Sequence, residues 1–306
     1  MIARAKQGRS NVTLPAQWRG ALGEVYYHAT YPGRLWYERR LAAAGRAPIA
    51  VLTFHRIADD GANPWTMRTQ DFVKAIRSLK SRFDLISLAE LQRRLREGVN
   101  DYASACITFD DGYAANCRVA LPLLVEERIP CTYFVTSSAV LEGRPFAHDV
   151  EMGSAGLALN TVEELRKFSR AGIEIGAHTR THANLGKITD LEQIYDELVT
   201  ARNELEAAVG QRIRYFAFPF GRVENMTGEA FEAAWAAGYE GVCSAYGGWN
   251  FPGDNPFHIR RRGVDGLPNR AKNWAMIDPI RSRRLPNFPC EIGSVPYAEH
   301  VFSWQI

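Results

Sequence analysis

Seven short apolar segments recur through the middle of this chain, and segments with helical periodicity separate most of them. Apolar runs of four to eight residues are typical of buried strands. Strands that alternate with helices build parallel sheets from βαβ units. We therefore expect an α/β fold, with strands over 48–55, 103–109, 131–135, 173–177, 215–220, 239–244 and 258–264.

Capping residues mark the ends of several expected helices. Ser87 is followed three residues later by Glu90, and Thr161 by Glu164, which is the spacing of a capping box. Helices are expected over about 88–96, 161–171, 191–209 and 228–237, and residues 139–160 are expected to form an irregular loop over a site.

Composition excludes several classes of protein. The chain has 306 residues, of which 46% are hydrophobic and 23% charged, and its net charge of +3 is too small to indicate a nucleic-acid partner. The five cysteines include no CxxC pair, so neither a disulfide framework nor a thiolate zinc site is predicted.

The two ends of the chain differ in composition from the middle. Residues 1–47 are basic and aromatic, without the apolar region of a secretory signal, and we expect a cytoplasmic protein without a membrane-spanning helix. This arm is expected to be a helix covering one end of the core, with peripheral membrane contact as the alternative. Residues 266–306, rich in Pro, Arg and Asn, are expected to be an irregular extension.

The first chemical motif follows the apolar run that ends at Phe109. Asp110 and Asp111 stand side by side before Gly112, which permits a sharp turn. Neighbouring residues on an extended chain point to opposite sides, so the two carboxylates are expected to have different roles. They repel each other unless a cation or a proton lies between them. The alternative is an ordinary surface turn.

The second motif places two histidines directly after another strand. His178 and His182 are four residues apart and could bind one ion together with a carboxylate. Two surface histidines in a loop are the alternative. The carboxyl ends of parallel strands meet on one face, where sites form. The polar residues expected there are His55, Asp110, Asp111, His178, the turn 219–221 and, less clearly, Arg261.

The third motif runs from Arg214 to Gly221. Arg214 could pair with a carboxylate and hold it ionised, or could be a solvated charge at a strand start. Pro219 and Gly221 shape a turn whose backbone N–H groups could face a developing oxyanion.

Together these motifs resemble those of the polysaccharide deacetylases, the family 4 carbohydrate esterases with the NodB homology domain. Thr-Phe-Asp-Asp-Gly, His-Thr-x-x-His and Arg-x4-Pro-aromatic-Gly occur in the family's order, and the resemblance spans about residues 50–265. It implies a single-domain distorted (β/α)7 barrel over 48–265, a divalent metal that is usually zinc, and hydrolysis of N-acetyl or sometimes O-acetyl groups on sugars.

The resemblance also implies roles for individual residues. By position, Asp110 is the general base, while Asp111, His178 and His182 are the metal ligands. Cobalt, nickel or iron could replace zinc at such a site.

The third motif of the resemblance supplies two further roles. Arg214 would orient Asp110, and the backbone N–H of Phe220 would help to bind the oxyanion. Phe220 stands where the family often has Tyr or Trp, which affects a hydroxyl contact but not the backbone role.

One departure concerns the general acid. The family's late Leu-x-His motif is not evident, but the strand ending at His55 precedes the Asp-Asp strand and would lie beside it. His55 could thus reach the same corner in a circularly permuted arrangement, as in the branch resembling poly-N-acetylglucosamine deacetylases. A histidine suits proton donation near neutral pH. His258 is the rival, a purely structural histidine is the other alternative, and His148 and Asp149 are weaker candidates for substrate contact.

The expected function is metal-dependent removal of N-acetyl groups from a sugar or polysaccharide, in the synthesis or modification of a surface glycan. An N-acetylated glycan is the expected partner. The alternatives are an O-acetyl esterase, a hydrolase of non-sugar amides, or a catalytically silent carbohydrate-binding domain.

Overall fold

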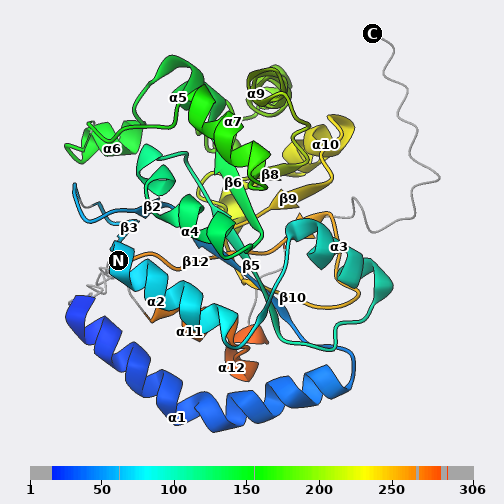
Figure 1. Ribbon diagram of the computed structural model, residues 1–306. Helices are drawn as coiled ribbons and strands as arrows, with labels where there is room; N and C mark the ends of the chain where they lie inside the picture. Colours follow the sequence, from blue (N-terminus) through cyan, green and yellow to red (C-terminus); the bar gives the residue numbers. More distant parts are fainter. Residues whose placement is uncertain (1–15, 62, 155, 267–268, 284–287, 289–306) are drawn as a thin grey trace, which may run out of the picture.

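The predicted parallel sheet is present and curls until it nearly closes into a barrel (Figure 1). The computed structural model describes residues 16–61, 63–154, 156–266, 269–283 and 288. Strands pair in the order β10-β1-β5-β6-β7-β8-β9-β11, and β12 returns to pair with β1. These strands are β1 (Ile49–Phe54), β5 (Ser104–Phe109), β6 (Cys131–Val135), β7 (Glu174–Ala177), β8 (Tyr215–Ala217), β9 (Gly241–Cys243), β10 (Trp249–Asn250), β11 (His258–Ile259) and β12 (Arg262–Gly263). Of these, β10 pairs antiparallel with β1; β4 (Asp84–Leu85) also pairs with β5, and β2 (Arg56–Ile57) and β3 (Thr66–Met67) form a separate pair.

The gap in the sheet between β9 and β1 is bridged by two short strands, β11 and β12. β11 pairs in parallel with β9, and β12, three residues further on, pairs in parallel with β1. The predicted strand 258–264 is therefore two short strands that bridge the gap. β1 itself lies beside β5 over six residue pairs from Ile49↔Ser104 to Phe54↔Phe109, which confirms the predicted neighbour relationship.

Helices cover the outside of the barrel (Figure 1). The predicted caps form: the Ser87 hydroxyl accepts from the Glu90 N–H, and Thr161 and Glu164 form a complete capping box. Each cap satisfies a backbone donor that the helix start leaves without a partner. The helices are α2 (Thr69–Lys80), α3 (Leu88–Glu97), α4 (Ala120–Glu126), α7 (Val162–Arg170), α9 (Ala201–Val209) and α10 (Gly228–Ala236).

The predicted helix over 191–209 is not regular. It consists of α8 (Leu191–Tyr195), a π-helical segment η3 (Asp196–Thr200), and α9. The Glu197 carboxylate in η3 accepts hydrogen bonds from the backbone N–H groups of Arg180 and Thr181, at 3.0 and 2.9 Å. The irregular segment therefore supports the loop between the two candidate histidines, which fits the frequent occurrence of π-bulges at functional sites.

The predicted irregular segment 139–160 contains helical residues at 139–142 and 147–151. α5 (Ser137–Glu142) and α6 (Ala147–Glu151) are short helices, too short for periodicity to reveal them from sequence. α5 is joined to the loop after β7 by backbone hydrogen bonds from Ser137 N–H to the Thr179 carbonyl and from Ser138 N–H to the Arg180 carbonyl, at 3.3 and 3.0 Å.

The N-terminal arm contains one long helix, α1 (Ala16–Ala43), which crosses one edge of the molecule (Figure 1). The extension after residue 265 is not wholly irregular, because α11 (Arg270–Ala275) and α12 (Pro279–Ser282) form within it. α11 packs against β1 and α2. Buried Arg34 of α1 donates to the carbonyls of Asn273 and Ile277, which ties α1 to the end of α11. Among the described residues, no helix is long and apolar enough to cross a bilayer.

Candidate metal centre and active site

Three side chains from two strand ends converge on one point. The Nε2 atoms of His178 and His182 lie 3.5 and 3.3 Å from Oδ1 of Asp111. One ligand atom from each residue lies within 4.8 Å of the other two. Two imidazoles and a carboxylate at this spacing are a donor set for a divalent transition metal, with positions left open.

Backbone geometry delivers these ligands. Asp111 follows β5 with φ of 76°, and Thr179 and His182 after β7 have φ of 60° and 63°. Non-glycine residues adopt this left-handed region at a cost and are found there mainly where the surroundings impose it. The turns aim side chains from the loops after β5 and β7, two strands that flank β6, at one point instead of continuing the strands.

His178 is held in the tautomer that metal binding requires. Its Nδ1 lies 2.8 Å from the Ala217 carbonyl oxygen, which can only accept, so Nδ1 carries the proton and Nε2 faces Asp111. Burial lowers the pKa of His178 to about 4, despite the nearby carboxylates of Asp110 and Asp111. The ring is therefore neutral at physiological pH, as a metal ligand must be.

Asp110 is fully engaged by an arginine. Arg261 Nη1 lies 2.6 Å from Oδ1 of Asp110 and Nη2 lies 2.9 Å from Oδ2. Arg261 is itself buried, and its Nε donates to the Ser244 carbonyl at 3.0 Å. Burial disfavours the charged carboxylate, but the Arg261 guanidinium outweighs this and holds the pKa of Asp110 below its usual value.

The prediction that Arg214 contacts Asp110 is wrong. Arg214 pairs with Glu174, with its Nε 2.8 Å from Oε1, and lies 3.6 Å from a carboxylate oxygen of Glu240. The physical reason is strand direction. Arg214 precedes β8 and lies at the amino end of the parallel strands, whereas Asp110 follows β5 at their carboxyl end.

His55 lies at the same edge of the sheet and is held by Asp265. Nδ1 of His55 is 2.5 Å from Oδ2 of Asp265, and the His55 backbone N–H donates to Oδ1 at 3.1 Å. Burial opposes charging of the ring, but Asp265, with Asp111 and Asp110, raises the pKa of His55 to about 10. His55 is thus protonated at neutral pH.

The rival histidine, His258, lies in the core. Its Nε2 is 3.1 Å from the Ser244 hydroxyl, and its ring packs against Phe231 and Tyr246. Burial lowers its pKa to about 3. A neutral, enclosed ring of this kind is poorly suited to donating a proton to a substrate.

Phe220 lies at the mouth of the site. Its backbone has φ of 61°, and 54% of the side chain surface is exposed while the ring contacts that of His182 at 5.2 Å between centroids. Within the described residues, no acceptor takes the Phe220 N–H. This donor is therefore available to a ligand.

Aromatic and polar side chains from α6 and its surroundings form one wall of the mouth. The ring of His148 stacks on Phe146 and meets that of His182 edge-on, with centroids 5.1 and 5.2 Å apart. The Tyr113 hydroxyl donates to Asp149 at 2.7 Å. His148, 22% exposed in its side chain, is placed where substrate could reach it, whereas Asp149 is buried and holds Tyr113.

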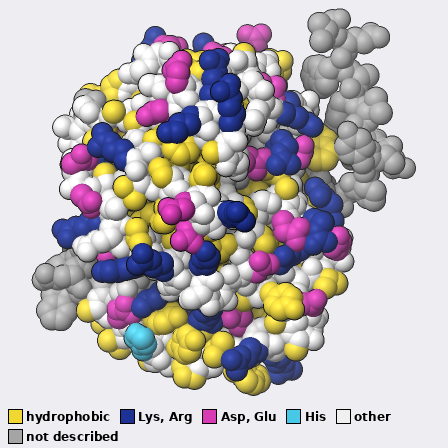
Figure 2. Space-filling model, in the orientation of Figure 1, with side chains coloured by type: hydrophobic (Ala, Val, Ile, Leu, Met, Phe, Trp, Pro, Cys, Tyr) yellow, Lys and Arg dark blue, Asp and Glu magenta, His cyan; other side chains and the backbone are white. Residues whose placement is uncertain are grey.

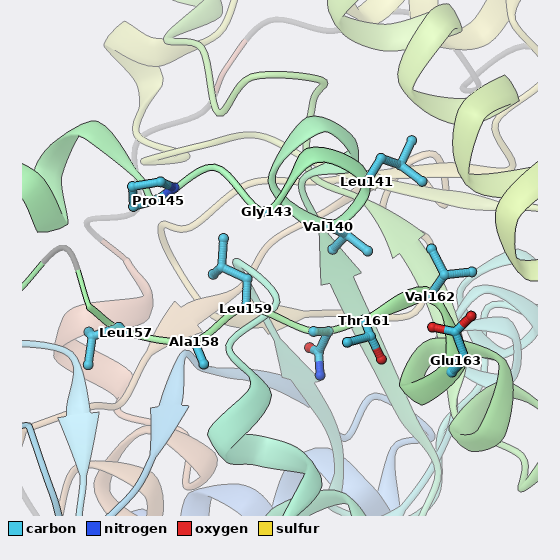
Figure 3. A pocket seen from close by; sticks show the side chains of 11 residues that line it. Val140, Leu141, Gly143, Pro145, Leu157, Ala158, Leu159, Thr161, Val162 and Glu163 are labelled. Atoms are coloured by element: carbon cyan, nitrogen blue, oxygen red, sulfur yellow. The ribbon is translucent and has the colours of Figure 1, made fainter.

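A pocket of about 390 Å³ lies next to this wall, between α5 and the segment 157–163 (Figure 3). Its lining is mixed: the aliphatic side chains of Val140, Leu141, Leu157 and Leu159 are joined by the polar residues Asn160, Thr161 and Glu163. It includes none of the three candidate metal ligands, so the chemistry belongs to the neighbouring strand ends.

Sequence reasoning did not assign two of the residues that complete the site. The sequence places Arg261 at a strand end but gives no signal for its pairing with Asp110. Asp265, just past the predicted strand 258–264, was not singled out. Their position in the sequence could have indicated them, because Arg261 and Asp265 both lie beside the short strands that close the sheet at its carboxyl face.

Comparisons with known proteins agree with this architecture. Residues 98–242 match the family model described as polysaccharide deacetylase. A chitooligosaccharide deacetylase of a Bradyrhizobium species is 29% identical over 131 residues, which cover 42% of this chain and 51% of the relative. The putative polysaccharide deacetylase YxkH of Bacillus subtilis is 27% identical over 134 residues, 44% of this chain and 42% of the relative. The chain spans about half the length of these relatives.

Two solved structures share the fold. IcaB from Ammonifex degensii has a TM-score of 0.62 and 22% identity, over 75% of this chain and 97% of that one. The Streptococcus pyogenes deacetylase PplD, solved with acetate, has a TM-score of 0.61 and 19% identity, over 75% and 99%. This chain therefore shares the barrel fold of these two proteins.

Proposed function

Because this chain belongs to the polysaccharide deacetylase family through residues 98–242, we propose that it is a metal-dependent hydrolase that removes N-acetyl groups from the sugars of a glycan. The convergence of Asp111, His178 and His182 is the observation that carries the proposal. His55 acts electrostatically on Asp111 and Asp110 acts on His178, and both His55 and Asp110 are fixed by a buried partner.

The donor set fits a divalent cation, with Zn²⁺ the most suitable. His178 is neutral with Nε2 free, and Asp111 is a buried carboxylate whose pKa is lowered, against the effect of burial, by His182 and His55. Bound there, a divalent cation would polarise an acetyl carbonyl and make a water more acidic.

Asp110 is the proposed general base. Arg261 occupies both carboxylate oxygens and keeps the group ionised, so Asp110 can accept a proton as water attacks the acetyl carbon. The Phe220 N–H then donates a hydrogen bond to the carbonyl oxygen as it gains negative charge.

His55 is the proposed general acid. It holds its proton at neutral pH and is oriented by Asp265. As the bond between the acetyl carbon and the sugar nitrogen breaks, His55 gives its proton to the leaving nitrogen. The products are acetate and a free amino sugar, which accounts for all atoms of the amide and the water.

The decisive experiment measures acetate released by the purified protein from chitooligosaccharides, poly-N-acetylglucosamine fragments and O-acetylated sugars. Metal is first removed from the protein with a chelator, and the protein is then tested with and without added Zn²⁺, Co²⁺, Ni²⁺ or Fe²⁺. We expect metal-dependent acetate release from N-acetylated substrates, with Asp110→Asn losing activity while keeping metal. Release from O-acetylated sugars alone would indicate an esterase. Glycan binding without any acetate would indicate a silent binding domain, and either result would overturn the proposal.

A further inference from the structure

The outward face of α1 carries an apolar stripe that runs along the helix. Leu22, Val25, Ala29, Pro32 and Trp36 are spaced by alternating steps of three and four residues, which places them on one side of a helix. All five are exposed, with Leu22 at 54%, Val25 at 67% and Trp36 at 62%. Exposed apolar stripes of this kind mark surfaces that contact a membrane or another protein.

The stripe is not needed to attach α1 to the protein. The opposite face of the helix holds it, through Arg34 on the α11 carbonyls and Glu38, which accepts from Arg82 at 2.9 Å. Tyr27 and Tyr31 lie on that same inner side with their ring centroids 5.5 Å apart, and the Arg82 guanidinium is 5.0 Å from the centre of the Tyr31 ring. The inner side of α1 therefore faces the barrel through polar and aromatic contacts, and the apolar stripe lies on the other side.

The charges around the stripe are basic. Arg39 and Arg40 are exposed, and the Arg40 guanidinium lies 5.6 Å from the centre of the Trp36 ring. Both acidic residues of α1 are engaged on its inner side, Glu24 with Lys272 and Glu38 with Arg82. Figure 2 shows hydrophobic side chains interspersed with Lys and Arg along the lower edge, where α1 lies in Figure 1.

We propose that this face of α1 docks on an anionic lipid surface, with the stripe buried in the headgroup region. A helix of 28 residues is about 42 Å long, and it combines an apolar stripe, a tryptophan and flanking arginines, the features of helices that lie in a membrane interface. The adjoining α12 adds another exposed apolar residue beside a basic one: Ile280 is 63% exposed and is followed by Arg281, whose guanidinium lies over the ring of Tyr26 in α1.

A lipid surface fits better than a second copy of the chain. If two copies met at this stripe, Arg39 and Arg40 of one copy would face α1 of the other. The carboxylates of that helix, Glu24 and Glu38, are already paired and would not neutralise them. Anionic phosphates would neutralise these arginines, with an expected gain in affinity of about fivefold for each.

Co-sedimentation of the full chain with vesicles tests the proposal. Vesicles contain phosphatidylcholine alone or phosphatidylcholine and phosphatidylglycerol in equal parts. The test variants are Val25→Glu with Trp36→Glu, and Arg39→Glu with Arg40→Glu. The matched controls carry the same changes elsewhere: Leu191→Glu with Tyr195→Glu, which are also exposed apolar residues on a helix, and Lys167→Glu with Arg170→Glu on α7.

We expect the unmodified protein to bind the anionic vesicles and not the neutral ones. Each α1 variant should lose binding by at least about tenfold, and both controls should retain it. Absence of binding by the unmodified protein, or equal losses in the controls, would overturn the proposal. So would a concentration-dependent dimer that Val25→Glu with Trp36→Glu abolishes in the absence of lipid. The assay needs no catalysis, so its outcome is independent of the proposed deacetylation.

Discussion

Arg261 binds Asp110 through two parallel hydrogen bonds of 2.6 and 2.9 Å, and neither side chain is exposed to solvent by more than a few per cent. The arginine lies between β11 and β12, in the segment that brings the sheet back to β1. Barrel closure and orientation of the proposed base therefore depend on the same short stretch of chain.

Arg261→Lys tests this relationship. Lysine keeps the charge but cannot form the two parallel bonds, so Asp110 should lose its fixed orientation. We expect kcat to fall by about 100-fold with a smaller change in KM and unchanged metal content. Arg214→Lys is the matched control, because it alters a partly exposed pair worth less than about 1 kcal/mol. Equal losses in the two variants would show that Arg261 does not act specifically on Asp110.

Asp265→Asn tests the pairing with His55. We expect NMR titration of the metal-free protein to show the pKa of His55 falling from about 10 toward 6.5, because the main charge that raises it is removed. Asp111 and Asp110 also face His55 and should keep part of the shift. Asp101→Asn, at an exposed carboxylate, should leave the titration unchanged.

The same pairing predicts a direction for the dependence of stability on pH. The pKa of His55 is higher in the folded than in the unfolded chain, so its stabilising effect is complete below pH 6.5 and disappears as pH rises through about 10. The free energy of unfolding of Asp265→Asn should therefore differ most from that of the unmodified metal-free protein in mildly acidic solution. A difference that grows with pH would contradict the assignment.

His178→Ala and His182→Ala should each weaken zinc binding by at least about 100-fold, because each removes a proposed ligand. Metal content after dialysis and the rise in melting temperature on adding zinc provide the measurement. His148→Ala is the control, since its ring touches that of His182 without belonging to the ligand set. Stoichiometric zinc in either ligand variant would count against the centre.

Gly221→Ala should distort the turn that presents the Phe220 N–H. Gly221 has φ of 58°, and an added Cβ would lie 2.5 Å from the backbone nitrogen of Ala245. We expect a loss of about 3 kcal/mol in unfolding free energy, together with reduced activity. Gly253→Ala is the control that distinguishes backbone strain from steric collision. Gly253 has φ of 89° but open space around it, so this substitution should lower the unfolding free energy by only about 1 kcal/mol. Chemical denaturation of both variants makes the comparison.

The sequence by itself indicated the principal strands of the barrel, most of the longer helices and the three side chains that converge at the candidate metal centre. Alternating apolar segments, together with Ser87 and Thr161 as caps, sufficed because strand burial and helix capping depend on residues near in sequence. Asp111, His178 and His182 could be proposed together because they lie in the loops that follow two predicted parallel strands, and the carboxyl ends of such strands meet on one face.

Only the tertiary structure decided which partners hold the reactive groups. Arg214 and Arg261 both flank strands and carry the same charge, but they lie at opposite ends of the sheet. Asp265 reaches His55 across 210 positions in the sequence. Such long-range pairs depend on how the sheet curls and closes, and that geometry is set by the packing of the whole chain, not by any local pattern of residues.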